Sequence, residues 1–171
     1  MNDNNPTLFF VDKEYLKYMH KIDYRVSVKY NNRVFVGIIT VIGSQKYVIP
    51  LTSQTTEARK REGKRKRSSL ITTFVTESNG TEIANILYNN MIPVYDEVIT
   101  PVTVNPEVDT YISNEIRFIR KTWEVIQNKA LYVYDERYLT SSKNYSFLVN
   151  TCCDFKKLEA ACQQYQVSTD N

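Results

Sequence analysis

Apolar and polar residues follow one another at strand spacing through most of the first hundred positions. Residues 33–42 are apolar and β-branched at nearly every position, which is typical of a central strand covered on both faces. Residues 43–45 predict a turn, and residues 47–51 predict the returning strand of a hairpin. Further short strands are predicted at 7–11, 69–75, 83–88 and 91–95, with a turn at Asn79-Gly80.

Apolar residues at helical spacing mark three other segments. Asp12 is expected to cap a helix over 13–22, because its side chain can accept a hydrogen bond from a first-turn N–H. Asn105-Pro106 is expected to open a long helix at about 106–130, since Pro is tolerated in a first turn. A C-terminal helix is predicted over 154–165. The apolar stripe of the long helix is Val108, Ile112, Ile116, Ile119, Trp123, Ile126 and Ala130.

The predicted strands come one after another instead of alternating with helices. This order predicts an α+β fold with a largely antiparallel, curved sheet. A chain of 171 residues can bury a sizeable core, and a single domain over 1–171 is expected. Pro50 cannot donate a ladder hydrogen bond, so pairing should weaken there and leave Thr52 and Ser53 where a loop begins.

The composition is that of an ordinary globular chain, with 42% hydrophobic and 24% charged residues. No stretch approaches the roughly 20 apolar residues that span a bilayer, and residues 1–5 are unlike a secretory signal. We therefore expect a cytoplasmic location. Cys152, Cys153 and Cys162 match no zinc spacing and are odd in number, so we expect packed thiols and no disulfide framework.

Positive charge is concentrated in one place, which we call the basic segment, residues 57–67. It carries seven basic and two acidic side chains, whereas the other 160 residues carry 15 basic and 17 acidic ones. Such a cluster attracts polyanions and speeds their encounter. A solvated loop, or a patch that docks an acidic protein, would have the same composition.

Several classes of enzyme lack their residues in this chain. There is no glycine-rich phosphate loop and no cluster of zinc ligands, so we expect no metal and no cofactor. A Ser-His-Asp triad would have to use His20, the one histidine. Lys17 and Lys21 lie close to it on an expected exposed helix face, and nothing nearby in sequence orients its ring. A surface or structural role is expected for His20.

RNA cleavage can proceed without a metal, because the ribose 2′-hydroxyl can attack the adjacent phosphorus. The protein then has to align the attack, stabilise the added negative charge and move protons. Hydroxyl groups, cations and tyrosines suited to this gather between 47 and 67: Tyr47, Thr52, Ser53, Lys60, Lys64 and Lys66. The chain also has 13 tyrosines, which can stack on unpaired bases, although most tyrosines in proteins serve packing.

Seven segments, in order along nearly the whole chain, match the motifs of one known family. They are EYLKY at 14–18, RVFVGI at 33–38, KYVIPLTS at 46–53, SSL at 68–70, MIP at 91–93, RFIR at 117–120 and CDFKKLE at 153–159. Together they resemble the ToxN/AbiQ toxins of type III toxin–antitoxin and phage abortive-infection systems. No single motif is specific, but their common order is.

The resemblance implies a compact, strongly twisted antiparallel sheet with surrounding helices, in a MazF/Kid-like fold with a barrel-like core. It also implies a metal-independent endoribonuclease that cuts single-stranded, A-rich RNA of target mRNA and leaves 2′,3′-cyclic phosphate ends. The inhibitor would be an RNA antitoxin built of pseudoknot repeats. Toxin and RNA would close into a ring-like assembly, with oligomers formed only through the RNA.

The resemblance also assigns candidate site residues. Thr52 and Ser53 match the active-site pair, and Tyr15 and Tyr30 resemble groove residues. The family commonly has a Lys two places after the Ser, where this chain has Thr55. The candidates for the missing cation and for holding RNA are Lys66, which aligns best with a family lysine, and Lys60, Lys64, Arg65 and Arg67.

Two further side chains complete the expected site. Arg33 stands where relatives can carry Lys, and an Arg, which does not readily give up a proton, is expected to bind phosphate. Tyr47 is expected to transfer a proton or contact RNA. The alternatives are a non-catalytic RNA-binding module, in which Ser53 has no special role, and a protein that docks an acidic protein partner.

Overall fold

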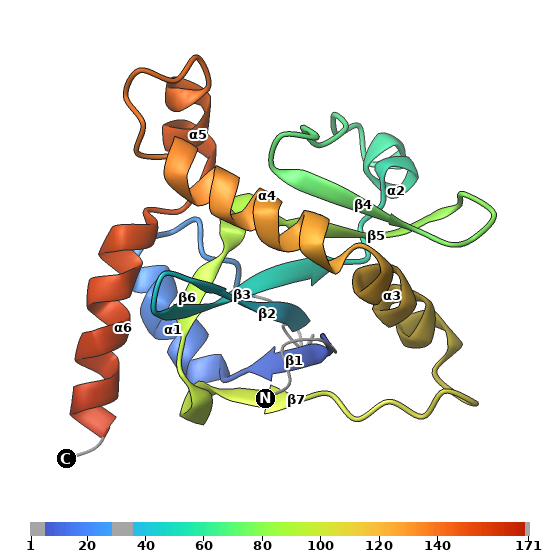
Figure 1. The fold of residues 1–171 in the computed structure, drawn as a ribbon, viewed down its shortest axis with the longest axis horizontal. Coiled ribbons are helices and arrows are strands. Elements are labelled where there is room, and N and C mark those ends of the chain that lie inside the picture. The colour runs from blue at the N-terminus through green and yellow to red at the C-terminus, as the bar shows by residue number, and fades with distance from the viewer. Residues whose placement is uncertain (1–5, 29–35, 170–171) are drawn as a thin grey trace.

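The computed structural model describes residues 6–28 and 36–169 (Figure 1). The strands are β1 (Leu8–Val11), β2 (Val36–Ile42), β3 (Gln45–Thr52), β4 (Thr72–Thr76), β5 (Glu82–Leu87), β6 (Ile92–Val94) and β7 (Ile99–Pro101). The helices are α1 (Lys13–Ile22), α2 (Thr56–Arg61), α3 (Thr110–Lys121), α4 (Trp123–Glu136), α5 (Tyr145–Thr151) and α6 (Phe155–Thr169), with 3-10 turns η1 (Tyr88–Asn90) and η2 (Asp96–Val98).

The strands form one antiparallel sheet in the order β4-β5-β3-β2-β1-β7, and β6 pairs with β3 beside that path. The α+β class and the antiparallel sheet are thereby confirmed. The sheet is open, because its path through the described strands ends at β4 and β7. A closed, barrel-like core is therefore not what these strands form.

Strand β3 changes partners along its length. Its first residues pair with β2 and β6, and within the described residues the β2 ladder ends at the pair Gly37–Pro50. Leu51 and Thr52 then pair with β5. Pro50 cannot donate to a ladder, so the change falls where the sequence predicted weaker pairing. The strand end that carries Thr52 thus lies between two parts of the sheet.

Gly37 allows β2 and β3 to approach closely. A Cβ at this position would lie 2.5 Å from Val48 Cγ2 and 2.6 Å from the Ile49 carbonyl oxygen. Both distances are shorter than van der Waals contact, so only glycine fits here without a shift of the backbone. The close approach fixes the register on which the β3 end depends.

The helices cover the sheet and enclose one hydrophobic core. Helices α1 and α6 lie side by side, α4 crosses the sheet, and α3 lies beside the β4–β5 hairpin (Figure 1). The prediction for α1 is confirmed in full, since it spans 13–22 and the Asp12 carboxylate accepts from Tyr15 N at 2.8 Å. The three cysteines are free and buried, as expected.

The single long helix predicted at about 106–130 is wrong, because the chain forms α3 and α4 instead. Asn105 caps a turn: its side chain accepts from Glu107 N at 3.1 Å, and its own N–H donates to Asp109 at 3.0 Å. The helix therefore begins only at Thr110. Thr122 breaks it, with φ −113° and ψ 17° and a hydroxyl that donates to the Phe118 carbonyl at 2.8 Å.

Candidate active-site cleft

A cleft of about 460 Å³ opens where the end of α1, the turn after it and the end of β3 meet. Pro50, Leu51 and Thr52 form one part of its wall. The polar or charged side chains around it are His20, Tyr24, Arg25, Ser27, Thr52, Gln54, Arg67 and Asn90. The cleft therefore brings predicted residues of β3 and of the basic segment together with residues of α1 and the turn that follows it.

The two hydroxyl residues at the end of β3 are accessible. Thr52 is half-buried and lines the cleft, and Ser53 is exposed. The Thr52 hydroxyl accepts from Gln54 N at 3.2 Å, and the Ser53 carbonyl accepts from Thr55 N at 2.9 Å. These bonds fold the chain into a tight turn directly after the strand. The prediction that Thr52 and Ser53 lie where a strand ends is confirmed.

Thr55 starts the short helix α2. Its hydroxyl accepts from Ala58 N at 3.2 Å while its backbone is extended, which is the geometry of an N-cap. A lysine could not provide that acceptor. The threonine that replaces the family's lysine therefore caps the helix in which the basic segment begins.

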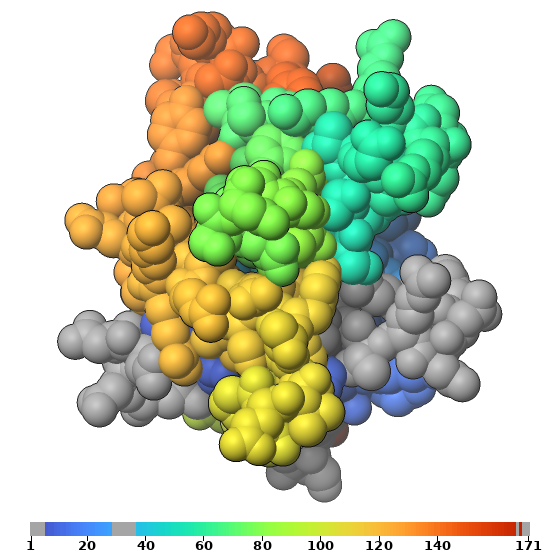
Figure 2. Space-filling view, turned by 90° about the vertical axis from the view of Figure 1, so that its right-hand side faces the viewer, coloured from blue at the N-terminus to red at the C-terminus, as the bar shows by residue number. Residues whose placement is uncertain are grey.

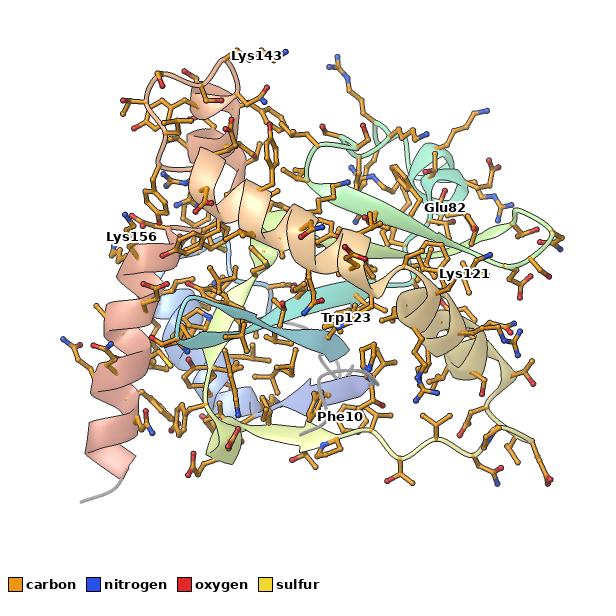
Figure 3. All side chains as sticks on the ribbon, in the orientation of Figure 1. Phe10, Glu82, Lys121, Trp123, Lys143 and Lys156 are labelled. Carbon is orange, nitrogen blue, oxygen red and sulfur yellow. The ribbon has the colours of Figure 1, made fainter. Side chains whose placement is uncertain are left out.

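Glu82 fixes α2 to strand β5 (Figure 3). One of its carboxylate oxygens accepts from Thr56 N at 2.7 Å and from Asn85 Nδ2 at 2.6 Å. Burial acts to raise the pKa of Glu82, but these hydrogen bonds and the charge of Lys66 outweigh it and hold that pKa below the usual value. Glu82 is therefore an ionised anchor for the helix.

Arg67 is the residue of the basic segment that lines the cleft. Its guanidinium donates to the Gln54 carbonyl at 2.9 Å and to the Gln54 side-chain oxygen at 3.0 Å. Arg59 donates to the same side-chain oxygen at 3.2 Å. Burial, and next the charge of Arg59, lower the pKa of Arg67, yet a guanidinium stays cationic at neutral pH. The cleft thus contains a fixed positive charge.

The other predicted cations of the basic segment lie outside the cleft. Lys60, Lys64, Arg65 and Lys66 are exposed. Lys64 pairs with Glu62 at 2.6 Å, and the Lys66 ammonium lies 4.7 Å from the centre of the Phe74 ring on β4. Figure 2 shows the α2 segment standing out beside the β4–β5 hairpin on one face of the molecule. These side chains are suited to long-range attraction of a polyanion.

Tyr15 and Tyr47 are core residues, which corrects their expected contact with RNA. Both side chains are fully buried. The Tyr15 hydroxyl donates to the Pro93 carbonyl at 2.6 Å, and the Tyr47 hydroxyl donates to Glu159 of α6 at 2.5 Å. Burial raises the pKa of both hydroxyls far above the ordinary value, so neither can transfer a proton near neutrality.

The remaining two candidates, Tyr30 and Arg33, lie outside the described residues. Their expected roles stay predictions.

Helix α6, which supplies the partner of Tyr47, packs against α1 and β6.

Sequence reasoning missed Tyr24 and Arg25, which follow α1. Tyr24 is 78% exposed at the edge of the cleft, and the Arg25 guanidinium lies 5.6 Å from its ring centre. Two N–H groups of Arg25 donate to the Asp23 carboxylate, each at 2.9 Å, and a third donates to the Val149 carbonyl at 2.9 Å. The one signal in the sequence was an aromatic residue between two opposite charges just after a helix.

Asp23 holds this turn in place although it is buried. Burial acts to raise the pKa of Asp23, but hydrogen bonds from Arg25 and from Asp154 N, the latter at 2.7 Å, hold that pKa below the usual value. Asn90 Nδ2 also donates to the Arg25 carbonyl, at 2.8 Å. The turn that carries Tyr24 is thus tied to three other parts of the chain.

His20 lies in the last turn of α1 and lines the cleft. Its Nδ1 is 2.7 Å from the Val26 carbonyl oxygen.

In the part of the chain that the structure describes, no group of three or more His, Cys, Asp or Glu side chains is placed to hold a metal ion. No described helix is long and apolar enough to cross a membrane.

Two curated proteins resemble the chain along most of its length. Endoribonuclease ToxN of Bacillus thuringiensis subsp. kurstaki is 25% identical over 176 residues, which cover 96% of this chain and 87% of the relative. Endoribonuclease AbiQ of Lactococcus lactis subsp. lactis is 27% identical over 163 residues, with 92% and 87% covered.

Solved structures show the same fold. The structure of AbiQ, a lactococcal anti-phage endoribonuclease of a type III toxin–antitoxin system, has a TM-score of 0.79 at 27% identity and covers 95% of this chain and 98% of AbiQ. A type III toxin selectively inhibited by a non-coding RNA pseudoknot has a TM-score of 0.83 at 24% identity, with 95% and 98% covered.

A family model gives the same assignment. The model of the toxin ToxN of type III toxin–antitoxin systems matches residues 7–163, which include every element from β1 to most of α6. The chain therefore belongs to the ToxN family of type III toxin–antitoxin toxins.

Proposed function

We propose that this protein is an endoribonuclease toxin that cuts single-stranded, A-rich RNA in its target mRNA without a metal and leaves 2′,3′-cyclic phosphate ends. The observation that carries the proposal is the cleft, in which Thr52 at the end of β3 lines the same space as the fixed cation of Arg67, with the exposed Ser53 next to it in the chain. The similarity to two named endoribonucleases supports it.

Thr52, Ser53 and Arg67 form the phosphate-binding part of the proposed site. Hydroxyl groups can donate to the non-bridging oxygens, and a guanidinium can bind two of them at once. The transition state carries more negative charge on these oxygens than the substrate does, so a fixed cation accelerates the reaction. Arg67 is better placed for this role than Lys66, because Lys66 lies against Phe74 outside the cleft.

Tyr24 is proposed to stack on a base of the bound RNA. Unpaired bases stack on aromatic rings, and a ring on a rigid support loses little entropy on binding. Arg25 supplies that support, since its guanidinium faces the ring and is itself held by Asp23 and Val149. Lys60, Lys64 and Arg65 are proposed to attract the RNA backbone without selecting its sequence.

The inhibitor is proposed to be an RNA antitoxin of pseudoknot repeats that occupies the same cleft, with oligomers formed only through this RNA in a ring-like assembly. One relative is a toxin inhibited by a non-coding RNA pseudoknot, and AbiQ is an anti-phage enzyme. We propose that the system acts in phage abortive infection.

The decisive experiment incubates the purified protein with a single-stranded A-rich RNA in the presence of EDTA and identifies the product ends by mass spectrometry. Cleavage with cyclic phosphate ends is expected for the wild type. Ser53→Ala should lose most of the rate. Ser78→Ala, at an exposed serine of the β4–β5 turn, should keep it. Intact RNA with the wild-type protein would overturn the proposal.

A second measurement separates cleavage from binding alone. Replacing Lys60, Lys64 and Arg65 with Gln should weaken RNA binding and reduce its salt dependence by a slope of about 2, at about 0.7 for each lost contact to a single strand. In a non-catalytic RNA-binding module, these changes would abolish binding and Ser53→Ala would change nothing. Resistance of a purified complex to RNase would instead indicate a protein partner.

A further inference from the structure

We infer that His20 is the general base of the cleft and removes the proton of the attacking 2′-hydroxyl, an inference that rests on the proposed endoribonuclease function. Sequence reasoning expected a surface or structural role for this residue, because nothing close in sequence orients its ring. The structure supplies the missing orientation through the Val26 carbonyl and places His20 in the same cleft as Thr52 and Arg67.

The hydrogen bond to Val26 fixes the tautomer of the ring. A carbonyl oxygen can only accept, so Nδ1 carries the proton and donates at 2.7 Å. In the neutral ring, Nε2 then has a lone pair, and it has no hydrogen-bond partner among the described residues. A ring that donates from one nitrogen and presents the other unprotonated has the arrangement of a histidine base.

The turn that holds the ring is rigid. Val26 is buried, and its N–H donates to the Asp23 carbonyl at 3.0 Å. Arg25 joins the same turn to the Val149 carbonyl, and Asn90 donates to the Arg25 carbonyl. The Val26 oxygen therefore has a fixed position, and with it the ring of His20. A base that is held in one orientation needs no reorganisation before it accepts a proton.

Among the described side chains that line the cleft, four are titratable: His20, Tyr24, Arg25 and Arg67. The two guanidiniums cannot release a proton near neutrality, and a tyrosine does so only around pH 10. Imidazole is the group whose charge changes between about pH 5 and 8. His20 is thus the one of the four whose side-chain type commonly serves as a general base.

The charges around the ring are mostly engaged with one another. On α1 itself, Lys17 pairs with Glu14 at 2.6 Å and Lys21 is exposed. On the turn, the Asp23 carboxylate is bound by Arg25. The end of β3 contributes only Pro50, Leu51 and Thr52, and η1 contributes Asn90. No carboxylate is among the described cleft residues, so the proton would pass from the substrate to Nε2 without a competing base.

The proposed step is a transesterification. Nε2 takes the 2′-hydroxyl proton, the 2′-oxygen forms a bond to phosphorus, and the bond from phosphorus to the 5′-oxygen breaks. The leaving 5′-oxygen takes a proton from water, and the imidazolium returns its proton to the resulting hydroxide. Arg67 balances the negative charge that builds up on the phosphate oxygens.

The test compares His20→Asn with the wild-type protein over pH 5 to 8, on a single-stranded A-rich RNA with EDTA. The asparagine amide can still donate to the Val26 carbonyl, so the fold of the turn should persist, but it cannot take a proton. We expect kcat to fall by about 10²–10⁴-fold with KM nearly unchanged. The acid limb of the wild-type pH profile should disappear in the variant. The control Lys21→Gln, which changes the next residue of α1, should keep the wild-type cleavage rate and pH profile.

Chemical rescue distinguishes a base from a structural residue. In His20→Ala, added imidazole should restore cleavage in proportion to the concentration of its neutral form. A wild-type rate and acid limb in His20→Asn would overturn the inference. It would also be overturned if imidazole failed to rescue His20→Ala and His20→Asn lost thermal stability, because His20 would then have only a structural role. A wild-type protein that leaves the RNA intact would instead refute the proposed function.

Discussion

Glu82 holds the basic segment against the sheet, and its removal has a calculable cost. Its carboxylate accepts two hydrogen bonds, from Thr56 N and Asn85 Nδ2. A hydrogen bond to a charged group contributes about 1.5–3 kcal/mol, and the low end applies because Glu82 is only half-buried. We therefore expect Glu82→Ala to lower the free energy of unfolding by about 3 kcal/mol. Glu82→Gln keeps a neutral acceptor and should cost about half of that.

The pH dependence of this difference provides the sharper test. The pKa of Glu82 in the folded protein lies below the ordinary value of 4.5. A carboxylate with a depressed folded pKa contributes stability that is fully present above the unfolded pKa and is lost as the pH falls through the folded pKa. Urea unfolding should thus show a constant gap between the wild type and Glu82→Gln from about pH 7 down to 5.

Below the ordinary value of 4.5 that gap should shrink, since a protonated glutamate resembles glutamine. Equal stabilities at pH 7, or a gap that widens on acidification, would refute the anchoring role of Glu82. Urea unfolding of Ser78→Ala over the same pH range, at an exposed site of the same hairpin, controls for a general effect of substitution.

Three other predictions concern Tyr24 at the edge of the cleft, the buried Tyr47, and Gly37 where β2 and β3 approach closely. Tyr24→Ala should weaken binding of single-stranded RNA about tenfold, within the 1–3 kcal/mol that base stacking contributes, while the exposed Tyr132→Ala should not, as measured by fluorescence anisotropy. Tyr47→Phe should lower the free energy of unfolding by about 1 kcal/mol in urea titrations with an unchanged cleavage rate; a loss of cleavage in folded protein would restore Tyr47 to the site. Gly37→Ala should destabilise by more than about 2 kcal/mol in calorimetry, because its Cβ would overlap Val48 and the Ile49 carbonyl. Gly80→Ala has open space and meets only the backbone strain of its φ of +85°, so it should cost less.

Local signals in the sequence were sufficient for α1 and for the end of β3. Asp12 caps the helix through a bond to a residue three positions away, and Pro50 limits its own pairing. Both effects depend on neighbours in the chain. For the same reason, the sequence alone is enough to place Thr52 and Ser53 at a strand end.

Other features depend on contacts that local sequence patterns do not reveal. Tyr47 looks like a polar residue near the site, but its partner Glu159 lies 112 positions away, and burial beneath α6 gives the ring a packing role. The orientation of His20 depends on a backbone carbonyl, which no side-chain motif reveals. The break at Thr122 was hidden because the apolar stripe continues through it with an unchanged period.

The anchors of the Tyr24 turn bear on how the protein is made on the ribosome. Asp23 and Arg25 are held by Asp154 N and the Val149 carbonyl, which are synthesised 131 and 124 residues later, respectively. Until those residues leave the exit tunnel, the wall that carries Tyr24 and the Val26 carbonyl lacks its supports. A nascent chain therefore completes this wall of the cleft only after residues 149–154 have left the ribosome, late in the synthesis of the chain.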